Sequence, residues 1–182
     1  IAQRQNSYFN RDILHFCSHQ HTPNNPAESF DGAVLTDNTA YIGWDIFSDY
    51  GIMGAVHNKE LITYVIDQLL GDDKSVVAKL PDRGVTTLAK QEKENRYINH
   101  LLYAHTTNRG EFYWEKNKYN IEVIEDIIPL YDVEAKVKVA ETVKKVSLVP
   151  ENVEIPFTME DGYVSYTVPK LWCHQMVVLD VE

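Results

Sequence analysis

The hydrophobic pattern along this chain changes its period near residue 72. Between Asn58 and Gly71, apolar side chains recur every three or four residues, so they would share one face of a helix. Asn58 can cap the start of this helix, and Gly71 can end it because glycine readily takes the left-handed conformation. The apolar face consists of Leu61, Ile62, Val65, Ile66, Leu69 and Leu70. After residues 72–74 the period falls to two, which is typical of strands.

The segment in front of this helix predicts helical turns, a loop and two strands. Apolar residues between positions 8 and 16 are spaced for successive helical turns, and the prolines within residues 21–26 predict a loop. Residues 32–36 and 39–43 predict two strands separated by a short turn, so we expect them to pair antiparallel. Residues 1–74 are therefore predicted to form a small α/β domain.

Residues 75–182 predict a series of short strands separated by turn residues. The strand ranges are 76–80, 84–89, 97–103, 121–124, 133–139, 145–149, 163–168 and 175–181. Asp161-Gly162 predicts a tight hairpin because glycine supplies the positive φ that such a turn requires. The polar and aromatic stretch 108–118 predicts a long hairpin or loop between strands. This spacing of strands is typical of an antiparallel β-sandwich.

Composition and charge limit the classes of function. The chain has 182 residues, of which 44% are apolar, so it can bury one full core and a smaller one. Its net charge of −10 disfavours nucleic acid and anionic membrane surfaces as partners, because both need a concentrated basic face. Cys17 and Cys173 lie in different predicted domains, so we expect free thiols. We therefore expect a soluble chain with no nucleic-acid or membrane partner, and we place it in the cytoplasm.

Residues 15–21 hold the densest group of side chains that can carry chemistry. The members of this group are His15, Cys17, His19, Gln20 and His21. On a helix His15 and His19 would share a face, as two ligands of a zinc ion do. No carboxylate or second cysteine stands at a metal-ligand spacing, so we favour local or interfacial hydrogen bonds, with contact to sugar hydroxyls as the remaining alternative. We expect no metal and no cofactor.

The sequence predicts no catalytic residue. Cys17 lacks the strand-to-helix turn that presents a nucleophile beside a base. Glu122, Glu125 and Asp126 have the composition of a glycosidase acid and nucleophile, but on a strand Glu122 and Asp126 would share a solvent-facing edge. We therefore expect these carboxylates to be solvated.

The three tryptophans are candidates for stacking on sugar rings. In small β domains tryptophan usually belongs to the core, so we expect Trp44 and Trp172 to be buried. Only Trp114, within the polar stretch 108–118, is expected at the surface.

Several stretches resemble one group of enzymes. They are Tyr8 to Arg11, His15 to Pro23, Asn95 to Ala104, Ile124 to Leu130, Val149 to Glu151 and Cys173 to Leu179. Together they are similar to the C-terminal region of bacterial glycoside hydrolases with a family 42-like β-galactosidase trimerisation domain. The nearest characterised relatives of that group are α-L-fucosidases. The resemblance spans nearly the whole chain.

The resemblance implies an architecture for the chain and for its parent. In such enzymes a catalytic (β/α)8 barrel precedes an amidotransferase-like α/β domain, which mediates oligomerisation, and a terminal β domain. Residues 1–74 would then be a partial amidotransferase-like, flavodoxin-like α/β domain, and residues 75–182 the terminal β-sandwich. The fold class that we expect is α/β plus all-β. The chain would be the C-terminal piece of a larger enzyme whose catalytic carboxylates lie on barrel loops outside it.

Two functions remain open. In the first, the chain is the non-catalytic accessory and oligomerisation region of a bacterial glycoside hydrolase, in a homo-oligomer such as a trimer. In the second, the sandwich is a carbohydrate-binding module that uses Tyr113 and Trp114 as a stacking platform. We favour the first because the aromatic residues interleave with strand cores. The candidate contacts to substrate or to another subunit are His15, His19, Gln20, His21 and Trp114.

Overall fold

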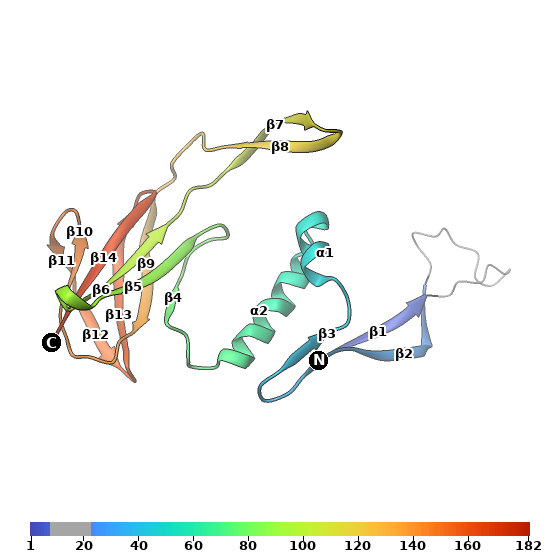
Figure 1. Cartoon of the computed structure of the whole chain (residues 1–182), viewed down its shortest axis with the longest axis horizontal. Helices are drawn as coiled ribbons and strands as arrows, with labels where there is room; N and C mark the ends of the chain where they lie inside the picture. Colours follow the sequence, from blue (N-terminus) through green and yellow to red (C-terminus); the bar gives the residue numbers. More distant parts are fainter. Residues whose placement is uncertain (8–22) are drawn as a thin grey trace. The chain divides into compact units, whose positions relative to one another are not determined.

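A computed structural model describes residues 1–7 and 23–182 of the chain (Figure 1). The chain divides into two compact units, Ile1–Asp73 and Lys74–Glu182. Most of the described residues lie in antiparallel strands, and the described part contains two α-helices. Neither of these helices is long and apolar enough to cross a membrane.

The first unit contains a three-stranded antiparallel sheet in the order β1-β2-β3. The strands are β1 (Ala2–Ser7), β2 (Asn24–Leu35) and β3 (Ala40–Ile42). Leu35 pairs with Ala40 at the end of a tight hairpin, so the predicted antiparallel pair is confirmed. The loop predicted for residues 21–26 is wrong from Asn24 onward, because this segment pairs with β1. Pro26 is accommodated there because the pairing with β1 shifts register between Gln5 and Ser7, where a ladder hydrogen bond can be missing.

Two helices follow this sheet. Asp45 caps α1 (Ile46–Met53), since its carboxylate accepts a hydrogen bond of 3.4 Å from the backbone N–H of Ser48. The helix α2 (Val56–Leu70) ends at Gly71, whose φ of +51° confirms the predicted stop. The cap predicted at Asn58 is wrong: the helix begins two residues earlier, and Asn58 is a buried residue of its first turn.

The first unit is not a partial amidotransferase-like domain. A flavodoxin-like domain consists of parallel strands whose connections are helical crossovers. Here β1, β2 and β3 pair antiparallel, and both helices follow the sheet in the chain without returning to a further strand of it. The α/β part of the expected fold class is therefore wrong. Strands and a helix within residues 1–74 do not by themselves indicate a flavodoxin-like fold. The short turn between β2 and β3 was the better guide, because it requires antiparallel pairing.

The second unit is a β-sandwich, as expected for this part of the chain (Figure 1). One sheet has the order β11-β10-β14-β6-β5 and the other has the order β12-β13-β9-β4. The strands are β4 (Val76–Ala78), β5 (Val85–Gln91), β6 (Arg96–Leu102), β9 (Leu130–Lys138), β10 (Val143–Val149), β11 (Val153–Glu154), β12 (Phe157–Glu160), β13 (Tyr163–Leu171) and β14 (His174–Val181), with a 3-10 turn at Glu92–Glu94. The predicted hairpin at Asp161-Gly162 is confirmed, since both residues have positive φ and join β12 to β13.

Alternate side chains of both sheets form the core of the sandwich. Its fully buried members include Leu101, Val137, Val146, Val164, Val168, Leu171, Val177 and Leu179. A polar bond also joins the sheets: the buried Tyr166 hydroxyl donates to Asn99 Oδ1 at 2.7 Å, and Asn99 Nδ2 donates to Thr86 Oγ1 at 2.8 Å. Burial raises the pKa of Tyr166, so this hydroxyl stays a proton donor at neutral pH. This hydrogen bond links β13 of one sheet to β6 of the other.

Candidate functional site: the projecting hairpin

Most of the residues singled out from the sequence lie outside the described part of the chain. These are His15, Cys17, His19, Gln20 and His21. Trp114 is described, and 64% of its surface is exposed. It lies on β7 (Thr107–Trp114), which pairs with β8 (Asn117–Val123) in a hairpin that extends from the sandwich (Figure 1). The long hairpin predicted around residues 108–118 is therefore confirmed, and Trp114 is exposed as expected.

Register places aromatic side chains together on one side of this hairpin. Phe112 pairs with Tyr119, and their rings stack with centroids 5.1 Å apart. Trp114 pairs with Asn117 next to the turn, and Glu115 and Lys116 form that turn with positive φ. Such φ values match a type I′ turn, whose twist suits a two-residue hairpin. The turn thus sets the register that brings the rings together.

The two faces of the hairpin differ in chemistry. Successive residues of a strand point to opposite sides, so residues two apart share a face. One side carries Phe112, Trp114, Tyr119 and Ile121, which are 42–64% exposed and which we call the aromatic face. The opposite side carries Tyr113 and an ion pair between Lys118 Nζ and Glu111 Oε1 at 2.6 Å. Tyr113 and Trp114 therefore point away from each other, and the expected Tyr113–Trp114 stacking platform lacks a shared surface.

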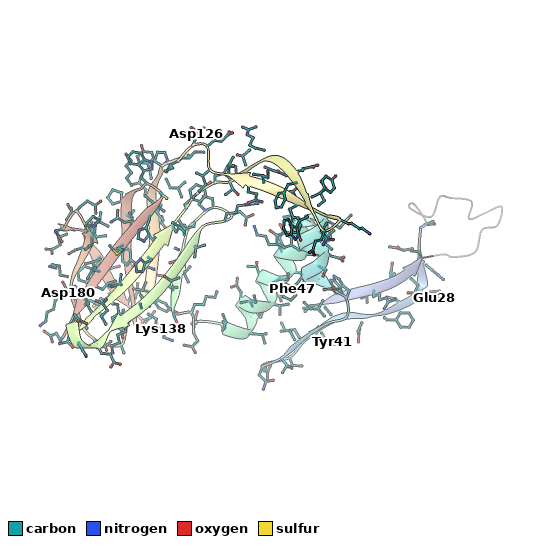
Figure 2. All side chains as sticks on the ribbon, turned by 45° about the horizontal axis from the view of Figure 1, so that its top comes forward. Glu28, Tyr41, Phe47, Asp126, Lys138 and Asp180 are labelled. Carbon is teal, nitrogen blue, oxygen red and sulfur yellow. The ribbon has the colours of Figure 1, made fainter. Side chains whose placement is uncertain are left out.

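Ion pairs hold the base of the hairpin. Arg83 Nη1 donates to Glu122 Oε2 at 2.7 Å, and the Thr106 hydroxyl donates to the same oxygen at 2.8 Å. Arg109 Nε donates to Glu125 Oε1 at 2.6 Å. These bonds tie the hairpin to the loop before β5 and to the segment after β8, where Asp126 lies (Figure 2). Glu122 and Glu125 are thus partners in surface ion pairs, and their side chains, 46% and 45% exposed, remain in contact with solvent as expected.

The same contacts make these carboxylates unsuitable as general acids. The hydrogen bond from Arg83, supported by Thr106, lowers the pKa of Glu122, and the hydrogen bond from Arg109 lowers the pKa of Glu125. A glycosidase acid instead needs a raised pKa so that it holds its proton at neutral pH. The hydrogen bonds of Glu122 and Glu125 instead indicate that these carboxylates hold the base of the hairpin in place.

The other two tryptophans are less buried than expected. Trp172 is 63% exposed, so its expected place in the core is wrong. Leu171 at the end of β13 is fully buried. Trp172 is the next residue, in the turn between β13 and β14, and its side chain lies at the surface. The Lys170 ammonium lies 5.2 Å from the centre of its ring. Trp44 is half-buried in the first unit.

Sequence reasoning missed two groups of side chains. Phe112, Tyr119 and Ile121 were not singled out, although their alternation with polar residues indicates one apolar side of a hairpin. His100 and His174 stack on neighbouring strands with Nδ1 and Nε2 at 3.0 Å, a contact that only the register of β6 against β14 reveals. Within residues 1–7 and 23–182, no three side chains of the metal-ligating types group together.

The fold of the second unit defines it as an antiparallel β-sandwich domain that carries a two-stranded hairpin. The particular similarity is to alpha-L-fucosidase isoenzyme 2 from Paenibacillus thiaminolyticus, with 42% sequence identity and a TM-score of 0.85. It covers 99% of this chain and 26% of that one, so the chain spans about a quarter of that enzyme's length.

Other comparisons add no identification. No family model matches the chain, and no curated protein matches it significantly. The structural similarity supports a domain region of a fucosidase-like glycoside hydrolase. It supports neither the family 42-like β-galactosidase detail nor an amidotransferase-like domain. The second of these also conflicts with the antiparallel sheet of the first unit.

Proposed function

We propose that this chain is the non-catalytic, C-terminal accessory and oligomerisation region of a bacterial glycoside hydrolase that acts on fucosides. The observation that carries this proposal is the 42% identity over 99% of the chain to about a quarter of an alpha-L-fucosidase. The low pKa values of Glu122 and Glu125 agree with it, because neither residue suits the acid step of glycoside hydrolysis. Fucoside hydrolysis would be an activity of the whole protein.

The aromatic face of the hairpin supports the oligomerisation role. A two-stranded hairpin is marginally stable by itself, and exposed apolar side chains on one side of it gain free energy when another surface covers them. A second copy of the chain is the occupant that we favour. Each copy carries a net charge of −10, so two copies can approach most closely where neither surface is charged. The aromatic face contains no charged residue.

The segment from His15 to Pro23 has a place in the same proposal. His19, Gln20 and His21 would donate and accept hydrogen bonds at a subunit interface or beside the active site of a neighbouring subunit. These residues lie outside the described part, so their role rests on the sequence. We also keep the cytoplasm as the expected location.

Two measurements test this proposal. The purified 182-residue chain should release no nitrophenol from nitrophenyl α-L-fucoside, and turnover by this chain would contradict the accessory role. In sedimentation velocity the chain should associate reversibly, and Trp114→Ser should weaken the association about tenfold or more. Tyr113→Ser changes the opposite side of the same strand and should leave the association unchanged. Equal sedimentation of all three proteins as monomers would contradict the role of the aromatic face.

A further inference from the structure

The outer face of the sheet β12-β13-β9-β4 is hollowed into a groove of about 480 Å³. Two rows of outward side chains line it: the first follows the register of all four strands, and the second continues at its ends into the residues next to β4 and β12. The rows are Val77-Lys136-Ser165-Thr158 and Lys79-Glu134-Thr167-Pro156. This volume falls within the range of about 300 to 1,000 Å³ that is typical of small-molecule sites. We call this feature the sheet groove.

The hollow follows from side-chain size. On β13 the outward positions in the middle of the floor are Ser165 and Thr167, which are short. Their neighbours on β9 are the longer Lys136 and Glu134, and Pro156 lies next to β12 on the other side. A row of short side chains beside taller ones makes a trough. Most of its lining belongs to the hydrogen-bonded strands β4, β9, β12 and β13.

The lining combines hydrogen-bonding groups with apolar surface and little free charge. Ser165, Thr167 and Thr158 supply hydroxyls that both donate and accept hydrogen bonds. Lys79 forms an ion pair with Glu134, which largely cancels both charges. The apolar part of the lining comes from Val77, Pro156 and Phe157, and the buried residues Ala135 and Tyr166 complete it.

Lys136 is the remaining charged group of the lining. Its ammonium lies 4.7 Å from the centre of the Tyr163 ring, which holds the cation at the side of the groove. The site therefore offers hydrogen-bond donors and acceptors beside the apolar surfaces of Val77, Pro156 and Phe157. That pattern suits an uncharged, polyhydroxylated ligand, whose ring C–H groups are apolar and whose hydroxyls need both kinds of partner.

We infer that the sheet groove is a carbohydrate-binding site for a neutral mono- or disaccharide. The choice of sugar as the ligand rests in part on the proposed function, because the chain would belong to a glycoside hydrolase that meets glycans. The groove itself lies on the sandwich and shares no residue with the aromatic face of the hairpin. It would hold a glycan near the enzyme, in addition to any sugar held at the catalytic centre.

The test is a titration of the full 182-residue chain, labelled with 15N, with L-fucose and separately with lactose. We expect saturable shifts of the backbone amide signals of Lys136, Ser165 and Thr167, with a dissociation constant on the order of millimolar for at least one sugar. Ser165→Tyr fills the trough and should weaken binding about tenfold or more. Thr87→Tyr places the same side chain on an exposed position of the other sheet and should bind as the wild type does.

A second variant guards against misfolding of Ser165→Tyr. Lys136→Met keeps the length of the side chain and removes its ammonium, so it should weaken binding severalfold with an unchanged circular dichroism spectrum. The inference is overturned if neither sugar shifts these signals at 100 mM, or if Ser165→Tyr folds and binds unchanged. Sedimentation of the same samples reports association through the aromatic face independently, so failure of the groove and failure of the proposed function give different results.

Discussion

The two units of this chain bury their apolar residues to different extents. The sandwich encloses a continuous core in which Leu101, Leu171 and Leu179 are completely buried. In the first unit, among the described residues, only Ala33, Ile46 and Val65 are buried apolar residues. Its exposed apolar residues include Phe30, Val34, Tyr41, Phe47, Ile52, Met53, Val56, Tyr64, Ile66, Leu69 and Leu70. A unit that leaves this much apolar surface uncovered has the smaller hydrophobic contribution to its own stability.

The largest effect should appear when the two units are separated. Residues 75–182 contain the complete sandwich core, so this fragment should be soluble and unfold in one cooperative transition monitored by circular dichroism. Residues 1–74 should show no cooperative thermal transition, because the three buried apolar side chains among the described residues of this fragment cannot offset the conformational entropy of the chain. A cooperative thermal transition of the 1–74 fragment, or an unfolded 75–182 fragment, would contradict the conclusion that the second unit is the more stable one.

Matched leucine substitutions should sharpen the same comparison. Leu171 is completely buried in the sandwich, and Leu171→Ala should lower the free energy of unfolding by about 2 to 5 kcal/mol. Leu69 in α2 is 37% exposed, and Leu69→Ala should cost less, about 1 kcal/mol or below. Urea denaturation of the whole chain would give both values. Equal losses would mean that Leu69 is covered in solution by a surface that this structure does not contain.

The smallest effect should come from the ion pair at the base of the hairpin. Because Arg83 lowers the pKa of Glu122 in the folded protein, the pair stabilises the fold above the unfolded pKa near 4.5. This stabilisation is lost as the pH falls through the lower, folded pKa. Arg83→Ala should therefore raise the pKa of Glu122 toward 4.5, as measured by NMR titration of its carboxyl carbon. The pKa of Glu125 should not change, because its partner is Arg109.

Features that depend on a few neighbouring residues could be predicted from the sequence. Gly71 ends α2, and Asp161-Gly162 forms a turn, because these residues tolerate positive φ. This preference belongs to the residue type and needs no distant partner. The alternation of apolar and polar residues after residue 75 indicated strands in the same way. The exposure of Trp114 followed from its polar neighbours.

Features that depend on distant partners could not be predicted. Whether Asn24 begins a strand depends on β1, and whether His100 and His174 stack depends on the register of β6 against β14. The sheet groove needs four strands in register before Ser165 becomes the floor of a trough.

The sequence by itself determined the end of α2 at Gly71, the turn at Asp161-Gly162, most strands of the second unit, and that this unit is a sandwich. The tertiary structure alone decided that β1 pairs with the segment from Asn24, that Trp172 lies at the surface, and where the groove lies. The physical reason is that turn and strand preferences are properties of short segments, whereas register and burial are set by side chains far away in the sequence.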